Sequence, residues 1–379
     1  MMKGYGNGSR NGRIVYLQYD KLIEPEFENI QYRGFQMRPI LTLLIIVGIF
    51  LITAGCTQIF LPASGAGNPT PTGDRNAVSG NPLVPSPPVT RNIIAAYWYL
   101  YPDPNDDTYP LVMSAKDQIP WKKINRLYIG FATVKNGVLT DLPSGDSAKD
   151  TTRRVEMQRR IREIVSLCRQ NNPEVEIFIT SNFGGAMDDE YLAAANDPQK
   201  FADSALSYLK AYGLDGYDMD WESQSIDNYA PQLTSLLSSC HATFAAAGPN
   251  PHSRPYKVTH AVWPGVESAQ TVAGLKDSVD QINIMSYGPG DTYDLVSYAD
   301  SYYQAGFPYE KMIGGIESEP GYPESGGPDT RASVGAKCAY VKANNLAGLF
   351  EWRMDNDMRP DNSPPTYQVT GWMYNCITG

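Results

Sequence analysis

The segment LDGYDMDWE at residues 214–222 places four carboxylates within eight consecutive positions and separates them with glycine and bulky apolar side chains. The apolar side chains between the charges indicate a buried strand rather than a solvated acidic segment. Side chains two positions apart in a strand point to the same side, so Asp218, Asp220 and Glu222 share one face. The side chains on the other face are those of Tyr217, Met219 and Trp221. Because these three suit packing against helices, we expect the carboxylates to face the inside of the fold.

Similar apolar runs recur along the chain after residue 92. Together with the segment above, the expected strands are 93–98, 126–132, 176–181, 216–221, 257–263, 281–287, 311–316 and 346–352. Near-continuous apolar runs of this length are typical of strands that are covered on both faces, as in a parallel sheet. The helices expected between them, from amphipathic spacing and end signals, lie at 151–170, 197–213, 226–247 and 329–344, with a shorter helix at the end of the chain.

Eight strands that alternate with helices over roughly 285 residues predict an α/β fold, a (β/α)8 TIM barrel, formed by a single catalytic domain at residues 92–379. A doubly wound open sheet is the alternative, and it more often carries a glycine-rich nucleotide turn after its first strand. The first expected strand continues instead as AAYWYLYP. Barrel enzymes place their chemistry at the C-terminal ends of the strands, and Glu222 lies at that end of the fourth expected strand.

Three neighbouring carboxylates in a desolvated barrel mouth cannot all ionise easily, because burial and like charge each raise the pKa of a carboxyl group. A carboxylic acid that stays protonated near neutral pH is what general acid catalysis of glycosidic cleavage requires. A calcium loop counted from Asp218 would lack the glycine at its sixth position and the glutamate at its twelfth. A metal-binding Asp-x-Asp pair of a glycosyltransferase, at Asp218 and Asp220, would leave Glu222 and the barrel unexplained.

The composition narrows the possible partners. The formal net charge is −10 and the isoelectric point is about 4.9, whereas binding to a phosphate backbone needs clustered Lys and Arg. The three histidines, at positions 241, 252 and 260, have no Cys or His partner at metal-ligand spacing. We therefore expect no nucleic-acid partner, no metal and no cofactor.

The N-terminal segment, residues 1–61, predicts export. Its apolar core at 40–61 follows six Lys or Arg residues in positions 1–39. One interpretation is a secretory signal that starts at Met37, in which ITAGC resembles a lipoprotein signal and Cys56 would be lipidated. The other is an uncleaved membrane anchor, since roughly 20 apolar residues can span a bilayer. Both place the rest of the chain at the extracellular face of the membrane, or secrete it.

A linker and four cysteines follow. Residues 62–91 are rich in Pro, Ser, Gly and Thr, a composition typical of an extended tether without a core. An exported protein permits disulfides, and Cys338 and Cys376 would lie on neighbouring helices at the end of the predicted barrel. Free buried thiols agree with the sequence equally well, so it leaves the pairing open.

The pattern DGYDMDWE at 215–222 resembles the Asp-Gly-x-Asp-x-Asp-x-Glu signature on the fourth barrel strand of glycoside hydrolase family 18, the chitinases and endo-β-N-acetylglucosaminidases. The other stretches similar to segments of that family are SNFGG at 181–185, NIMSYG at 283–288, GFPYEKMIGGI at 306–316 and GLFEWRMDND at 348–357. Only about 30 residues separate the last two expected strands. That length leaves no room for the small α+β insertion that deepens some chitinase clefts.

The resemblance implies a role for each matching residue. Glu222 would protonate the glycosidic oxygen, while Asp220 would orient the substrate's 2-acetamido group and stabilise the oxazolinium formed from it. Asp218 would tune Asp220, and Tyr287 would hydrogen-bond the acetamido oxygen. The residues expected to contact the sugar are Trp352, Tyr97, Met285, Gly184 and Gly185. Packing in an ordinary core remains the alternative for Trp352, Tyr97 and Tyr287.

The leading hypothesis is an exported, chitinase-like hydrolase that cleaves β-1,4 linkages after N-acetylglucosamine by substrate-assisted, retaining catalysis. One alternative is an endo-β-N-acetylglucosaminidase that acts on the chitobiose cores of N-glycans. Another is a non-catalytic chitin-binding lectin on the same barrel, a class that typically loses the acid that Glu222 would supply. The expected partners are thus an N-acetylglucosamine-containing polysaccharide or glycan and, through the N-terminal anchor, a membrane.

Overall fold

A computed structural model describes residues 92–102, 108–141, 148–181, 187–290, 293–320 and 326–379. The N-terminal segment, the linker and Cys56 lie outside these ranges, and so do Gly184 and Gly185. No helix within the described ranges is both long and apolar enough to cross a bilayer.

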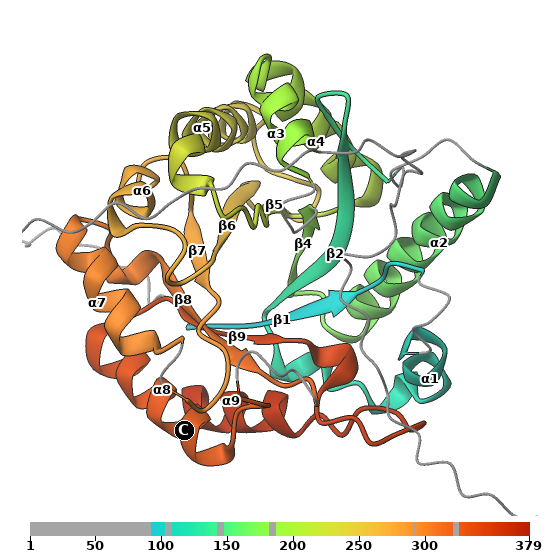
Figure 1. Cartoon of the computed structure of the whole chain (residues 1–379). Coiled ribbons are helices and arrows are strands. Elements are labelled where there is room, and N and C mark those ends of the chain that lie inside the picture. The colour runs from blue at the N-terminus through green and yellow to red at the C-terminus, as the bar shows by residue number, and fades with distance from the viewer. Residues whose placement is uncertain (1–91, 103–107, 142–147, 182–186, 291–292, 321–325) are drawn as a thin grey trace, which may run out of the picture. The chain divides into compact units, whose positions relative to one another are not determined.

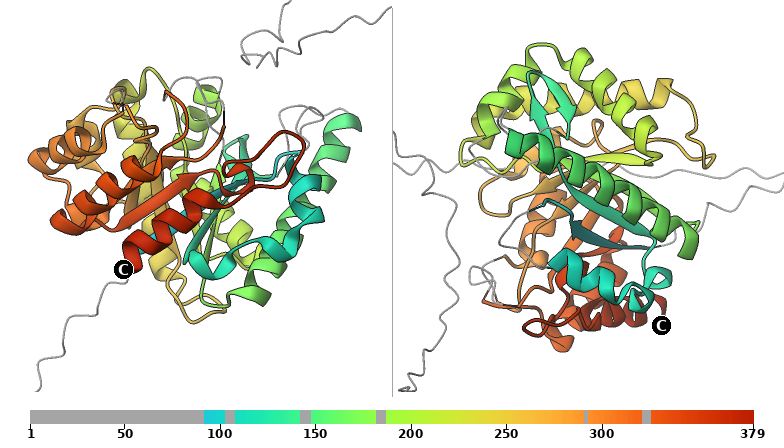
Figure 2. Two further views of the ribbon diagram at one scale, coloured as in Figure 1. Left: turned by 90° about the horizontal axis from the view of Figure 1, so that it is seen from below. Right: turned by 90° about the vertical axis from the view of Figure 1, so that its right-hand side faces the viewer.

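Eight parallel strands form a closed barrel with helices around its outside (Figures 1 and 2). The barrel strands are β1 (Ile93–Tyr99), β2 (Arg126–Lys135), β4 (Glu176–Ser181), β5 (Gly216–Met219), β6 (Lys257–Val262), β7 (Gln281–Ile284), β8 (Met312–Glu317) and β9 (Gly348–Trp352). Their order around the ring follows the chain, and β1 closes the ring by pairing with both β2 and β9. The predicted (β/α)8 barrel is confirmed, and the acidic segment lies on its fourth strand, β5.

β5 and β7 end two and three residues earlier than the sequence suggests. β5 stops at Met219 and β7 at Ile284, before the expected ends at residues 221 and 287. After Ile284 the amides of Ser286 and Tyr287 donate hydrogen bonds to carbonyls two residues earlier, at 2.7 and 3.0 Å. Such tight turns take a chain out of a regular sheet. Both early ends lie next to residues with expected catalytic roles.

The expected helices are present with small shifts at their ends. They are α2 (Ala148–Asn171), α4 (Pro198–Tyr212), α5 (Ala230–Ala246), α8 (Arg331–Asn344) and the terminal α9 (Gln368–Thr378). The signals that bound α4 act as predicted. The Asp197 carboxylate accepts a hydrogen bond from the Lys200 amide, Pro198 begins the helix, and Gly213 ends it in the left-handed conformation.

Several short elements were not predicted. They are α1 (Thr108–Ser114), α3 (Asp188–Ala195), α6 (Ala269–Gly274), α7 (Leu295–Ala305), β3 (Val138–Thr140) and the 3-10 turns η2 (Lys116–Gln118), η3 (Trp121–Lys123), η5 (Ile226–Tyr229), η6 (Tyr309–Lys311) and η7 (Met354–Asn356). β2 is longer than expected because its end forms a hairpin with β3. The turn is Asn136-Gly137, with φ positive at both residues, and Asn-Gly is a common signal of a hairpin turn.

The strands separate two apolar cores. The outer core lies between strands and helices and contains Tyr217, Met219 and Trp221, as the alternation in the acidic segment predicts. The inner core fills the barrel and consists of Ala95, Tyr97, Tyr128, Phe178, Met285, Ile313 and Phe350. Gly216 makes room for this filling, since a Cβ at that position would lie 2.3 Å from Cε1 of Phe178. The barrel is thus a packed support for the site.

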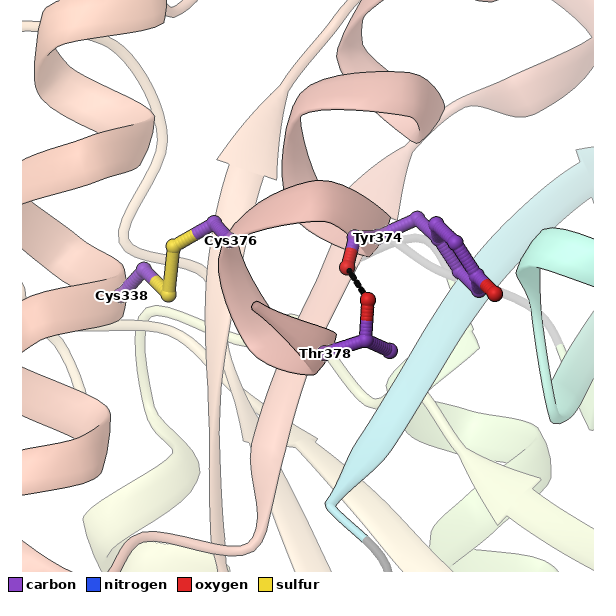
Figure 3. The surroundings of a disulfide bond; sticks show 4 residues. All are labelled: Cys338, Tyr374, Cys376 and Thr378. Atoms are coloured by element: carbon purple, nitrogen blue, oxygen red, sulfur yellow. Dashed lines mark hydrogen bonds between the residues drawn. A yellow bond between two sulfur atoms is a disulfide. The ribbon is translucent and has the colours of Figure 1, made fainter.

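A disulfide joins Cys338 of α8 to Cys376 of α9 (Figure 3). Cys168 and Cys240 are free and buried. The pairing that the sequence left open is therefore between the two cysteines expected on neighbouring helices. It ties the last helix of the chain to the helix that precedes β9.

Candidate active site

Asp218 lies inside the barrel, fully buried and surrounded by hydrogen-bond donors. Its Oδ2 accepts from the Tyr97 hydroxyl at 2.8 Å and from the Thr180 hydroxyl at 3.1 Å. Its Oδ1 accepts from the Thr259 hydroxyl at 2.5 Å and from the Asn283 amide at 3.2 Å. Burial raises the pKa of Asp218, while the bonds from Thr259 and Tyr97 oppose that rise. Of the two buried members of the row, Asp218 is therefore the one whose negative charge is offset by several hydrogen-bond donors.

Asp220 has a different environment on the same inward face of the chain. It is only 5% exposed, and within the described residues its Oδ1 has no hydrogen-bond donor. Burial raises the pKa of Asp220 well above its usual value, and the negative charges of Glu222, Asp218 and Glu267 raise it further. Burial and the neighbouring negative charges thus favour the protonated form of Asp220, in line with the raised pKa that the crowding in the sequence predicts for at least one of these carboxyls.

Glu222 is the outermost of the three carboxyls. It follows the end of β5 by three residues and is half-buried, whereas Asp218 and Asp220 are closed off from solvent. Its neighbours Trp221 and Ser223 are buried on the opposite side of the chain. Burial thus decreases stepwise along the row, and Glu222 is the member that a bound molecule can reach.

A second wall of the site comes from β7. Met285 belongs to the inner core, and Tyr287 is half-buried with its ring edge-on to Phe350, the two centroids 5.9 Å apart. The backbone on both sides of Tyr287 is bound by α8. Lys337 Nζ donates to the carbonyls of Ser286 and Gly288 at 2.5 and 3.0 Å.

The third wall carries Trp352 at the end of β9. Its half-buried ring lies 5.7 Å from Tyr97 and 6.0 Å from Phe131, measured between centroids. Its indole Nε1 donates to the Glu319 carboxylate at 3.2 Å, and Asn356 donates to the other oxygen of that carboxylate at 2.6 Å. The edge of the tryptophan is thereby fixed while part of the ring stays accessible.

Tyr97 lies deeper than the sequence analysis suggests. It is 3% exposed and stacks on Tyr128 with 4.6 Å between ring centroids. Besides donating to Asp218, its hydroxyl accepts a hydrogen bond from Asn283 at 2.9 Å. This placement gives Tyr97 a contact to the carboxylate row, and a direct contact to sugar stays a prediction. The two glycines expected at the sugar, Gly184 and Gly185, lie outside the described residues.

Three partners of Asp218 were not identified from the sequence. They are Thr180, Thr259 and Asn283. Each is a polar residue on a barrel strand, and Thr180 and Thr259 pair directly with Asp218 in the sheet register. Polar residues at matching inward positions of neighbouring strands were the signal that could have revealed them.

A buried pair of His260 and Glu267 lies beside the carboxylate row. His260 Nδ1 donates to the carbonyl of Met219 at 2.9 Å, and its Nε2 lies 3.0 Å from Oε2 of Glu267. Burial lowers the pKa of His260, but the Glu267 carboxylate, the Met219 carbonyl and Asp218 together outweigh it, and the net shift is upward. Since the carbonyl can only accept, the geometry fits an imidazolium between two acceptors. Among the described residues, no group of three or more His, Cys, Asp or Glu side chains is arranged to hold a metal ion.

The model of glycosyl hydrolases family 18 matches residues 94–316, which run from Ile94 of β1 to Ile316 of β8 and contain the carboxylate row. The chain belongs to this family. Chitotriosidase-1 of Mus musculus is 23% identical over 254 residues, which cover 54% of this chain and 53% of the relative. Chitinase B of Serratia marcescens is 23% identical over 235 residues, or 55% of this chain and 44% of the relative. The chain thus spans about half the length of these curated relatives.

Solved structures show the same barrel. A class V chitinase from Nicotiana tobaccum in complex with NAG4 superposes with a TM-score of 0.60 at 17% identity, covering 76% of this chain and 99% of that one. The chitinase-like agglutinin from Robinia pseudoacacia has a TM-score of 0.56 at 16% identity, covering 75% and 99%. At sequence identities of 16–17% the similarity shows the fold alone. An enzyme and an agglutinin both have this fold.

This family 18 member differs from the family pattern on two strands. Gly288 follows Tyr287, where many chitinases carry an acidic residue, and β8 leads into Glu317-Ser318-Glu319. Glu317 is fully buried and its pKa is raised well above the usual value by that burial, whereas Glu319 holds Trp352. Between β8 and β9 the described residues contain α8 and no strand, in line with the absence of an α+β insertion expected from the loop length.

Proposed function

We propose that this chain is a chitinase-like hydrolase that cleaves β-1,4 linkages after N-acetylglucosamine. The observation that carries the proposal is the row Asp218, Asp220 and Glu222, in which burial decreases outward. Tyr287, which follows β7, and Trp352, which ends β9, belong to other strands of the same barrel. A reachable acid above two buried carboxyls suits a reaction in which a proton leaves Glu222 while positive charge develops nearby.

In the proposed first step Glu222 gives its proton to the glycosidic oxygen, and the bond from that oxygen to C1 of the sugar breaks. The carbonyl oxygen of the sugar's own 2-acetamido group forms a bond to C1, which gives a cyclic oxazolinium. Family 18 uses this substrate-assisted route in place of an enzyme nucleophile. Water then attacks C1 from the side of the departed group while the bond from C1 to the acetamido oxygen breaks and restores the acetamido group. Glu222 takes the water proton, and the product keeps the β configuration.

Asp220 and Asp218 would stabilise the charged intermediate. In the free site burial and neighbouring negative charge favour a protonated Asp220. A cation that forms on the acetamido group reverses this preference, because opposite charge favours the ionised carboxyl. The ionised Asp220 is then a stronger acceptor for the acetamido N–H. The proton that Asp220 loses passes to Asp218. An interaction that strengthens as the charge develops raises kcat.

Two aromatic side chains would hold the sugar. Trp352 offers a partly accessible ring whose edge Glu319 fixes, and the apolar face of an N-acetylglucosamine unit can stack on it. Tyr287 would donate to the acetamido oxygen and press it toward C1. Chitin oligosaccharides are the first substrate, and N-glycan chitobiose cores the second, because both contain this unit.

We also propose that the protein is exported and held at the outer face of the membrane. The support is the apolar sequence at 40–61 and the Cys338–Cys376 disulfide, a bond that persists in oxidising compartments. Protease treatment of intact cells should degrade the catalytic domain. Protection of the domain until the cells are lysed would contradict export.

The enzymatic proposal is tested by incubating the purified chain with chitin tetramer to hexamer and, separately, with a high-mannose glycoprotein. We expect shorter N-acetylglucosamine oligomers from the first mixture and none from Glu222→Gln, which should still bind the oligomer. Release of glycan that leaves one N-acetylglucosamine on the glycoprotein would identify an endo-β-N-acetylglucosaminidase. Binding with no cleavage by the unmodified chain would identify a lectin, the function suggested by the agglutinin with the same fold.

A further inference from the structure

The backbone that carries Glu222 lies beyond the regular sheet. β5 ends at Met219, so Glu222 lies three residues past its last residue. A catalytic acid must nevertheless be held closely, since a displacement of about 1 Å can lower the rate about 100-fold. Some contact outside the strand therefore has to fix this part of the chain.

Asp188, the first residue of α3, binds the residues on both sides of Glu222. Its Oδ1 accepts a hydrogen bond from the indole Nε1 of Trp221 at 2.7 Å. Its Oδ2 accepts from the hydroxyl of Ser223 at 2.8 Å. The same hydroxyl accepts from the amide of Ser225 at 3.1 Å, which extends the connection along the chain. One carboxylate thus uses both of its oxygens to hold the positions immediately before and after the acid.

Aromatic stacking reinforces this attachment. The Trp221 ring lies between Tyr191 of α3, at 4.7 Å and 20°, and Tyr229 of η5, at 5.6 Å and 12°. Trp221 and Ser223 are 1% and 2% exposed. Because side chains alternate along an extended chain, fixing these two on the helix side directs Glu222 to the barrel side.

We propose that Asp188 is a positioning residue that holds the Trp221–Ser223 segment so that Glu222 is presented to the glycosidic oxygen. This inference rests on the proposed function, in which Glu222 is the acid. Asp188 acts through two neighbours of the acid and does not itself touch the substrate. A carboxylate suits the task because Trp221 Nε1 can only donate and the Ser223 hydroxyl has a proton to donate. Asp188 also lies at a helix N-terminus, where negative charge is favoured.

The test compares Asp188→Ala, Asp188→Asn and the control Asp189→Ala on chitin oligomer hydrolysis. Asp189 is the exposed next residue of the same helix, so its substitution makes the same charge change. We expect Asp188→Ala to lower kcat about 10- to 100-fold with KM and oligomer affinity within about threefold. Asp188→Asn should recover most of kcat, since its amide can accept from Trp221 and donate to Ser223. Asp189→Ala should behave like the parent.

A double-mutant cycle and an activity-independent signal complete the test. Trp221→Phe removes the indole donor, so combining it with Asp188→Ala should cost much less than the product of the two single losses. The NMR signal of the Trp221 indole proton, assigned by its disappearance in Trp221→Phe, should shift in Asp188→Ala. Unchanged kcat in Asp188→Ala, or an equal loss in Asp189→Ala, would overturn the positioning role while the parent still hydrolyses chitin. No hydrolysis by the parent would overturn the proposed function and this inference with it.

Discussion

At the scale of single residues, the site depends on carboxyls of similar chemistry that are given different environments. Asp218 accepts hydrogen bonds from four side chains, and Asp220 has few donors and several negative neighbours. Burial and negative neighbours therefore favour a protonated Asp220, while Glu222 lies where a ligand can reach it. The donors to Asp218 come from the other barrel strands β1, β4, β6 and β7, so the acidic segment alone does not reveal this difference.

Asp220→Asn should inactivate the enzyme and stabilise the fold. An asparagine cannot carry the negative charge that offsets an oxazolinium, so we expect kcat to fall at least 100-fold. The raised pKa of Asp220 means that its contribution to stability is fully present below the unfolded-state pKa and is lost as pH rises toward the folded value. The variant avoids that loss and should gain about 0.5–2 kcal/mol at neutral pH.

Urea unfolding at pH 4 and pH 7.5 checks the second part. The gain in unfolding free energy should be present at pH 7.5 and shrink toward zero at pH 4, where aspartate in the unfolded chain is partly protonated. An equal gain at both pH values would show that ionisation of Asp220 is not its origin. Asp218→Asn gives a comparison at a site where four donors surround the carboxylate.

The sequence was sufficient to predict the residues of the acidic row but not their supports. Alternation along a strand follows from backbone geometry, so the shared face of Asp218, Asp220 and Glu222 could be inferred from nine residues. Asp188 lies in an eight-residue helix more than thirty positions away, and its bonds exist only because α3 packs beside the end of β5. Patterns within a short stretch of sequence cannot predict such tertiary contacts.

At the scale of elements, α8 supports the wall that carries Tyr287. Lys337 and Asp329 form a buried ion pair at 2.9 Å. Asp329 also accepts hydrogen bonds from the amides of Gly288 and Glu317 at 3.0 and 2.8 Å, so the pair connects the ends of β7 and β8. Burial lowers the pKa of Lys337, and the adjacent Asp329 opposes that shift.

Lys337→Met should destabilise the domain by about 3–5 kcal/mol, because it leaves the Asp329 carboxylate buried without its cation. Removing the charge of the partner as well, in Lys337→Met with Asp329→Asn, should recover part of this loss. Lys342→Met, at an exposed lysine of the same helix, should change the unfolding free energy by less than about 0.5 kcal/mol. Chemical denaturation of the four proteins measures these differences, and an equal effect of the two lysine variants would contradict the role of the ion pair.

At the scale of the whole domain, the barrel fixes where each wall of the site lies. The strand count predicted this architecture because eight apolar runs separated by helices leave few alternatives. The early ends of β5 and β7 and the β2–β3 hairpin were not predicted. The ends of β5 and β7 follow local turns and tertiary contacts instead of hydrophobic periodicity. The N-terminal predictions concern residues outside the described ranges and stay predictions.

The disulfide acts on the stability of the whole domain. Cys338 and Cys376 are separated by 38 positions, and cross-linking a loop of this length restricts the unfolded chain by about 4 kcal/mol in the chain-entropy model. Replacing both cysteines with serine should therefore lower the unfolding free energy by about 2–4 kcal/mol. Dithiothreitol should lower the stability of the parent similarly and leave the double variant unchanged. A parent that is insensitive to reductant and equal to the variant would contradict this role.

The most direct test of the central claim is the configuration of the first product. Proton NMR spectra recorded during cleavage of chitin hexamer, before mutarotation, distinguish the α and β anomers at the new reducing end. Substrate-assisted catalysis through Glu222 and Asp220 predicts β product from the parent and no product from Glu222→Gln. Initial α product, or cleavage that survives Glu222→Gln, would contradict the assignment of Glu222 as the acid of a retaining, acetamido-assisted reaction.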